Sequence, residues 1–132
     1  MNRIGLVSYL VREYDEAVDY FTNILSFSLV EDTLLPEEHK RWVVVEPNGD
    51  GGSRVLLARA SRPAEIAQVG RQAGGRVAFS LETDDFWGDY ERYKCRGVRF
   101  REDPREERYG VVAVFEDLYG NRWDLVQPLT PP

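Results

Sequence analysis

The chain has 132 residues, of which 42% are hydrophobic and 30% charged, and its formal net charge is −6. This length suits one domain with a sizeable core, and the composition makes neither a disordered nor a membrane class the default. The acidic balance argues against nucleic acid or an anionic membrane as a partner, and no apolar run reaches the roughly 18 to 20 residues of a membrane-spanning helix.

The first half of the chain alternates strand and helix patterns. A helix is expected at residues 15–25, because its apolar residues fall on one stripe at helical spacing: Ala17, Val18, Phe21, Ile24 and Leu25. Acidic residues at its start suit the positive end of a helix. Strands are expected at 4–11, 26–33, 40–46 and 54–59, with a turn cluster at 47–53.

Residues 61–75 change character, since a proline opens a short helical or irregular piece that glycines then break. The same order of elements then recurs, with a strand at 76–82, a helix at 84–95, a strand at 98–101 and a hairpin. The charged run 99–108 is read mainly as a solvated loop. Each half is therefore β-α-β-β-β.

We predict an α+β protein and a single domain over 1–132, built from two βαβββ modules at 1–60 and 76–132 with a linker at 61–75. The modules would form a curved, partly open eight-stranded sheet around a cavity, which is a natural small-molecule site.

The closing hairpin is the most informative stretch. Strands at 111–115 and 123–127 flank a turn at 117–121. Because side chains alternate along a strand, Trp123 and Leu125 share one face and Asp124 lies on the other. The Asp124 carboxylate faces either solvent or a cavity, and which of the two it faces decides much of the function.

Two stretches resemble the vicinal oxygen chelate superfamily, which includes glyoxalase I, extradiol dioxygenases, and fosfomycin- and bleomycin-resistance proteins. Residues 11–27, VREYDEAVDYFTNILSF, are similar to the family's strand-helix opening. Residues 115–125, FEDLYGNRWDL, are similar to its closing hairpin, with a D-x-x-G-N-x-x-E-L-like pattern. The resemblance implies the fold, and it implies much less about activity because this fold hosts unrelated functions.

Metal-dependent members of that family place four ligands on strands of both halves. The matching positions here are Leu6, Leu57, Arg76 and Asp124. Only Asp124 can bind a metal ion, since leucine has no donor atom and arginine stays protonated. We therefore expect no metal and no other cofactor, and hypothesise that Arg76 replaces the cation and pairs with Asp124. Such a pair either offers N–H donors to an oxygen-rich ligand or is purely structural.

Further candidates for the cavity wall are Ser8 and Ser80, whose hydroxyls could bind a ligand. Trp42 and Tyr109 occupy matching positions in the two halves, and they either flank a planar ligand or belong to the core. His39 lies in a polar connection between strands and is interpreted as a solvated loop residue. The alternative is a lid residue that closes the pocket and acts as acid or base.

Cys95 is the single cysteine, so the chain has no internal disulfide and a cytoplasmic location is expected.

The main functional expectation is a protein that binds a small organic molecule without metal. The alternatives are an enzyme of the superfamily, with glyoxalase-type lyase or dioxygenase-type chemistry and a metal-dependent or metal-free site, and a structural or regulatory dimer with a filled cavity. Since relatives of this length usually pair, the resemblance also implies a homodimer.

Overall fold

The computed structural model describes residues 1–48 and 52–129, so three residues of the turn cluster expected at 47–53 lie outside the described residues. The chain divides into two compact units, Met1–Gly70 and Arg71–Pro132. This division falls inside the expected linker, where the short helix α2 (Pro63–Gln68) begins at its proline.

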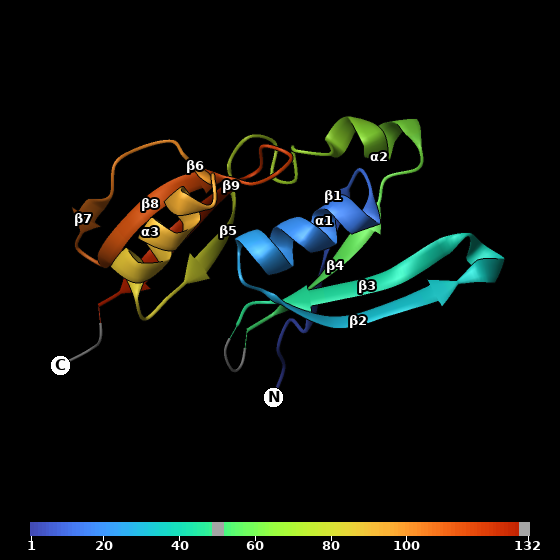
Figure 1. Cartoon of the computed structure of the whole chain (residues 1–132), viewed down its shortest axis with the longest axis horizontal. Coiled ribbons are helices and arrows are strands. Elements are labelled where there is room, and N and C mark those ends of the chain that lie inside the picture. Colours follow the sequence, from blue (N-terminus) through green and yellow to red (C-terminus); the bar gives the residue numbers. More distant parts are fainter. Residues whose placement is uncertain (49–51, 130–132) are drawn as a thin grey trace. The chain divides into compact units, whose positions relative to one another are not determined.

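The first unit is a four-stranded sheet covered by one helix (Figure 1). Its strands lie in the order β1-β4-β3-β2, and β1 runs parallel to β4 while the other neighbours are antiparallel. The strands are β1 (Leu6–Val11), β2 (Ser28–Leu35), β3 (Lys40–Glu46) and β4 (Arg54–Arg59). The helix α1 (Tyr14–Asp19) continues as a π-helical segment, η1 (Tyr20–Ile24), and a short 3₁₀ turn, η2 (Pro36–Glu38), joins β2 to β3.

The stripe predicted for the first helix is confirmed as its buried face. Ala17, Phe21 and Leu25 are each at most 2% exposed, and the other two residues of the stripe, Val18 and Ile24, are half-buried. The Phe21 ring meets the Tyr9 ring of β1 edge-on, with centroids 5.3 Å apart. Tyr9 therefore marks the face of the sheet that the helix covers, and we call the opposite face of each sheet its helix-distal face.

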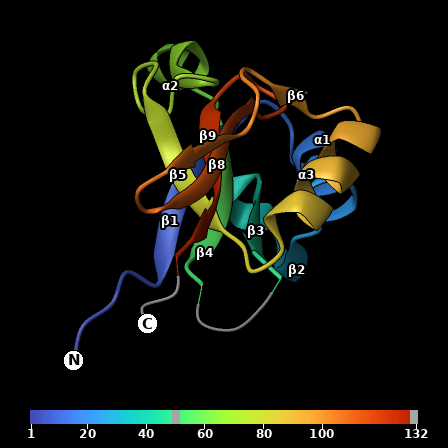
Figure 2. The ribbon, with the colours of Figure 1, turned by 90° about the vertical axis from the view of Figure 1, so that its left-hand side faces the viewer.

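The second unit repeats this plan with a five-stranded sheet, in the order β5-β9-β8-β6, and β7 also pairs with β8. Its strands are β5 (Val77–Glu82), β6 (Arg99–Phe100), β7 (Arg105–Glu107), β8 (Gly110–Glu116) and β9 (Arg122–Pro128). Helix α3 (Phe86–Cys95) covers one face of this sheet (Figure 2). As in the first unit, the opening strand β5 runs parallel to the closing strand β9.

Aromatic rings form the core under α3. Tyr93 of the helix meets Phe115 of β8 edge-on at 5.7 Å, and Phe115 stacks on Trp123 of β9 at 5.8 Å. Phe79 of β5 packs on the other side of Trp123. Rings of this size bury much apolar area and stabilise a small sheet that one ten-residue helix covers.

The α+β class and the repeated order of elements are confirmed, with two differences. The strands are divided between two sheets, so the described residues do not form one eight-stranded sheet. In addition, the run 99–108 is not simply a solvated loop: besides β6, which lies within the strand expected at 98–101, it contributes the unexpected β7, and both pair with β8. The many charged residues of this run give no apolar strand pattern, because a strand at the edge of a sheet tolerates charged side chains. No helix in the described part of the chain is long and apolar enough to cross a membrane.

Candidate functional site

The turn between β8 and β9 is organised by one buried carboxylate. Asp117 is 7% exposed, and its Oδ1 accepts the backbone N–H groups of Tyr119 and Asn121, each at 3.0 Å. Its Oδ2 accepts the indole N–H of Trp123 at 2.9 Å and the Asn121 side-chain amide at 3.2 Å. Gly120 supplies the positive φ of 95° that the turn needs. The D-x-x-G-N pattern is therefore a structural device that sets the register of the hairpin.

This register places Asp124 as predicted, on the face opposite Trp123 and Leu125. Trp123 and Leu125 are buried toward α3, whereas Asp124 is half-buried on the helix-distal face. Its neighbours across the sheet are Val114 on β8 and Ser80 on β5. The Ser80 hydroxyl donates to Asp124 Oδ2 at 3.3 Å. The structure thus brings together two of the residues that were expected to share a site.

Arg76 does not join this pair. Within the described residues no ion pair of 4.0 Å or less connects Arg76 to Asp124, so the predicted clasp is wrong for this structure. The reason lies in the register of β5. Ser80 is the residue opposite Asp124, and Arg76 precedes it by four positions, which is about 13 Å along an extended strand. Arg76 stands just before the strand and is exposed.

In the first unit, Leu6 and Ser8 lie on the helix-distal face of β1, because they alternate with the helix-facing Tyr9. Leu57 was expected beside them, and this is wrong. It pairs with Tyr9, is fully buried and therefore faces the helix. Leu56 pairs with Ser8 and takes the helix-distal position.

The two aromatic candidates differ in setting. Trp42 lies within β3 on the helix-distal face and is 36% exposed, since it alternates with the buried Val43. Tyr109 is 54% exposed and stands in the turn before β8, outside any strand. The correspondence between them expected from the repeat does not extend to their local structure.

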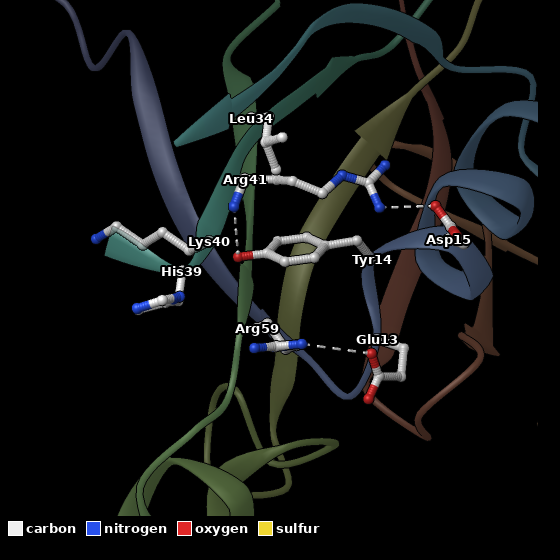
Figure 3. A pocket seen from close by; sticks show the side chains of 8 residues that line it. All are labelled: Glu13, Tyr14, Asp15, Leu34, His39, Lys40, Arg41 and Arg59. Carbon is white, nitrogen blue, oxygen red and sulfur yellow. Dashed lines mark hydrogen bonds and ion pairs between the residues drawn. The ribbon is translucent and has the colours of Figure 1, made fainter. Parts of the chain in front are cut away.

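A separate groove lies in the first unit, around the ring of Tyr14 at the start of α1 (Figure 3). Its volume is about 450 Å³. The guanidinium groups of Arg41 and Arg59 both stand over this ring, 5.1 and 5.6 Å from its centroid. The lining residues are Glu13, Tyr14, Asp15, Leu34, His39, Lys40, Arg41 and Arg59.

Arg41 is held firmly in this groove. It donates two hydrogen bonds to the Asp32 carboxylate, at 3.0 and 2.6 Å, and a third to Asp15 at 2.8 Å. These bonds lower the pKa of Asp32, because they favour its charged form, and for the same reason they raise the pKa of Arg41. His39, at the end of the β2–β3 connection, has a left-handed φ of 53° and is exposed.

Sequence reasoning missed this groove. Its residues come from the start of α1 and from the adjoining ends of β2, β3 and β4, and no local periodicity links them. The single signal available was the concentration of arginine and aromatic residues at positions 41 and 42.

The family model of the Glyoxalase/Bleomycin resistance protein/Dioxygenase superfamily matches residues 3–125. The chain belongs to this superfamily. A relative in Shewanella frigidimarina, named as an uncharacterized protein, is 54% identical over 121 residues, which are 92% of this chain and 90% of that protein.

Solved structures agree with this assignment of the fold. UcmS2 superposes with a TM-score of 0.80 at 24% identity and covers 96% of this chain and 98% of its own. At that identity the likeness shows the fold alone. TnmS3, described as an antibiotic binding protein from Streptomyces sp. CB03234, superposes with a TM-score of 0.75 at 26% identity, covering 98% of both chains. The superfamily fold is therefore established for this protein.

Proposed function

We propose that this superfamily member binds a small organic molecule without metal or another cofactor, at the helix-distal face of the second unit. The observation that carries the proposal is the Ser80–Asp124 pair, which lies beside Val114 and Val126 on that face. A few oriented polar groups in mainly apolar surroundings are typical of small-molecule sites. The carboxylate accepts hydrogen bonds or attracts a cationic group of the ligand, and the Ser80 hydroxyl orients it.

The donor set supports binding without metal. Of the four positions that the resemblance assigned to the family's ligands, Leu57 faces the helix and Arg76 lies outside β5. Only Asp124 carries a suitable donor, whereas sites for ions such as Zn²⁺ use three or four protein ligands. Residues 1–48 and 52–129 contain no cluster of three or more histidine, cysteine or acidic side chains that could hold a metal ion. This donor set supports a site that works without a tightly bound divalent ion.

The relatives support the same class of function. TnmS3 is described as an antibiotic binding protein, and its fold covers almost all of this chain. Natural products of that kind are consequently the first ligands to test. The competing hypothesis is an enzyme of the superfamily in which Asp124 serves as a base or as a metal ligand.

The test is native mass spectrometry with a panel of natural-product antibiotics, in EDTA and separately in Zn²⁺, Ni²⁺ or Mn²⁺. We expect a complex with one ligand per chain that persists in EDTA. Asp124→Asn and Ser80→Ala should weaken it by about 10- to 100-fold for the carboxylate and less for the hydroxyl, because bonds to charged groups contribute more. Asp103→Asn, an exposed carboxylate of the same unit, is the matched control.

A complex that forms only with metal, or turnover of the ligand, would favour the enzyme. If neither Asp124→Asn nor Ser80→Ala weakened binding, the ligand would bind at another site.

We also propose that the protein acts as a cytoplasmic homodimer. Exposed apolar side chains such as Leu29 and Trp87, at 44% and 56%, support an interface with a second copy. Light scattering after size-exclusion chromatography tests this, and a monomer at micromolar concentration would contradict it.

A further inference from the structure

The groove around Tyr14 gathers several cationic side chains in an acidic protein. The chain has a formal net charge of −6, yet the groove is lined by three cations, Lys40, Arg41 and Arg59, and by two carboxylates, Glu13 and Asp15. Its volume of about 450 Å³ lies in the range of small-molecule pockets. Lys40 and Arg41 are also paired with carboxylates outside the lining, Glu38 at 3.5 Å and Asp32 at 2.6 Å, so Arg59 is the cation of the groove whose charge is least compensated.

The two arginines of the groove, Arg41 and Arg59, differ in how many of their guanidinium N–H donors already have an acceptor. Arg41 is occupied by Asp32 and Asp15. The Arg59 guanidinium has only a long ion pair with Glu13, at 3.8 Å, and forms no hydrogen bond with any described residue. Its guanidinium nevertheless has a fixed place over the Tyr14 ring, 5.6 Å from the centroid. Arg59 therefore presents unused N–H donors in a position that is already organised.

Tyr14 adds a second donor beside it. Its hydroxyl oxygen accepts the backbone N–H of Arg41 at 3.3 Å, which orients the phenol. Among the described residues nothing accepts the hydroxyl hydrogen. Figure 3 shows this hydroxyl, the His39 ring and the Arg59 guanidinium around the same opening. An anion in that opening can take hydrogen bonds from both Tyr14 and Arg59.

We propose that this groove is a second binding site, for a small organic oxyanion, independent of the site at Asp124. The oxyanion group, a carboxylate or a phosphate, accepts a two-pronged contact from Arg59 and the hydroxyl hydrogen of Tyr14. The bound oxyanion replaces the Glu13 carboxylate, whose contact with Arg59 is long, as the partner of this guanidinium. The exposed Leu34 covers the apolar part of the ligand.

Two probes separate the sources of the oxyanion: sodium benzoate for carboxylates and inorganic phosphate for phosphate esters. Each is titrated into the ¹⁵N-labelled protein at constant ionic strength, with sodium chloride as reference. We expect saturable shifts of the Arg59 Nε–H signal and of the backbone amides of Tyr14 and Arg41 with at least one probe and none with chloride. Arg59→Gln should weaken binding by about tenfold or more, and Tyr14→Phe by a smaller factor, because the ring and its packing remain.

Arg54→Gln is the matched control, since Arg54 lies at the other end of β4 and is also exposed with one acidic partner. It should leave the affinity unchanged, and unchanged melting temperatures should show that the variants are folded. Shifts that do not saturate, that chloride reproduces, or that Arg59→Gln leaves intact overturn the proposal. Asp124→Asn should not alter these titrations. The proposal for the groove and the proposal for the site at Asp124 can therefore fail independently of each other.

Discussion

Replacing Asp117 by alanine tests how the closing hairpin is held. The change removes the acceptor for the backbone N–H groups of Tyr119 and Asn121, for the Asn121 side-chain amide and for the Trp123 indole. Asn121 and Trp123 are 4% and 3% exposed, so water does not readily replace the lost partner. A buried donor without a partner costs about 1 to 3 kcal/mol. Counting the Trp123 indole and the Asn121 backbone as buried, we expect a loss of about 3 to 5 kcal/mol in the free energy of unfolding.

Urea denaturation followed by tryptophan fluorescence measures this loss, and hydrogen exchange of the Trp123 indole reports the turn directly. Asp117→Asn should lower the free energy of unfolding by less, about 2 kcal/mol. Its side-chain oxygen still accepts the backbone N–H groups, but its NH₂ group faces the indole N–H, so that two donors meet. Asp103→Ala, at an exposed site of the same unit, should change stability by less than about 0.5 kcal/mol. A cost below about 1 kcal/mol for Asp117→Ala with an unchanged denaturant slope would refute the reasoning, because the backbone alone would then set the turn.

Three further predictions follow from the strands. Gly110→Ala should destabilise the protein strongly in thermal unfolding, since φ is 151° and a Cβ would lie 2.1 Å from a backbone carbonyl of β9, whereas Gly5→Ala, with open space around it, should not. Leu57→Ala should cost about 2 to 5 kcal/mol and Leu56→Ala clearly less, because only the former is fully buried. The hydrogen bonds from Arg41 hold the pKa of Asp32 below its usual value. The Asp32 carboxylate therefore stabilises the folded protein fully above its unfolded-state pKa, and this stabilisation is lost as the pH falls through its lower folded-state pKa. Asp32→Asn should therefore flatten the acid side of the stability–pH curve, and an unchanged curve would contradict this.

Local patterns in the sequence sufficed for most of the fold. The stripe of Ala17, Phe21 and Leu25 is a helical period, and the alternation of Trp123 and Asp124 is a strand period, so both can be read within one element. The duplication predicted the same order of elements in the two units, and the structure confirms it apart from the additional short strand β7.

What the sequence could not supply depends on register and on tertiary assembly. Leu57 and Leu56 differ by one position, and one position inverts the face of a strand. Arg76 failed as the partner of Asp124 because the residue opposite that carboxylate is set by the pairing of two strands distant in sequence. The Tyr14 groove joins residues 13–15 to residue 59, and only the folded chain brings these together.

The parallel pairing of β1 with β4 has a consequence for biosynthesis. Leu6 pairs with Arg54 and Val11 with Arg59, so β1 can pair only after nearly fifty further residues have been synthesised. The second unit has the same plan, with Val77 paired to Arg122. Such distant pairings slow the search for the native state. Each half can therefore close only when its last strand has emerged, and a nascent chain halted before residue 54 would expose an unpaired, apolar first strand to chaperones.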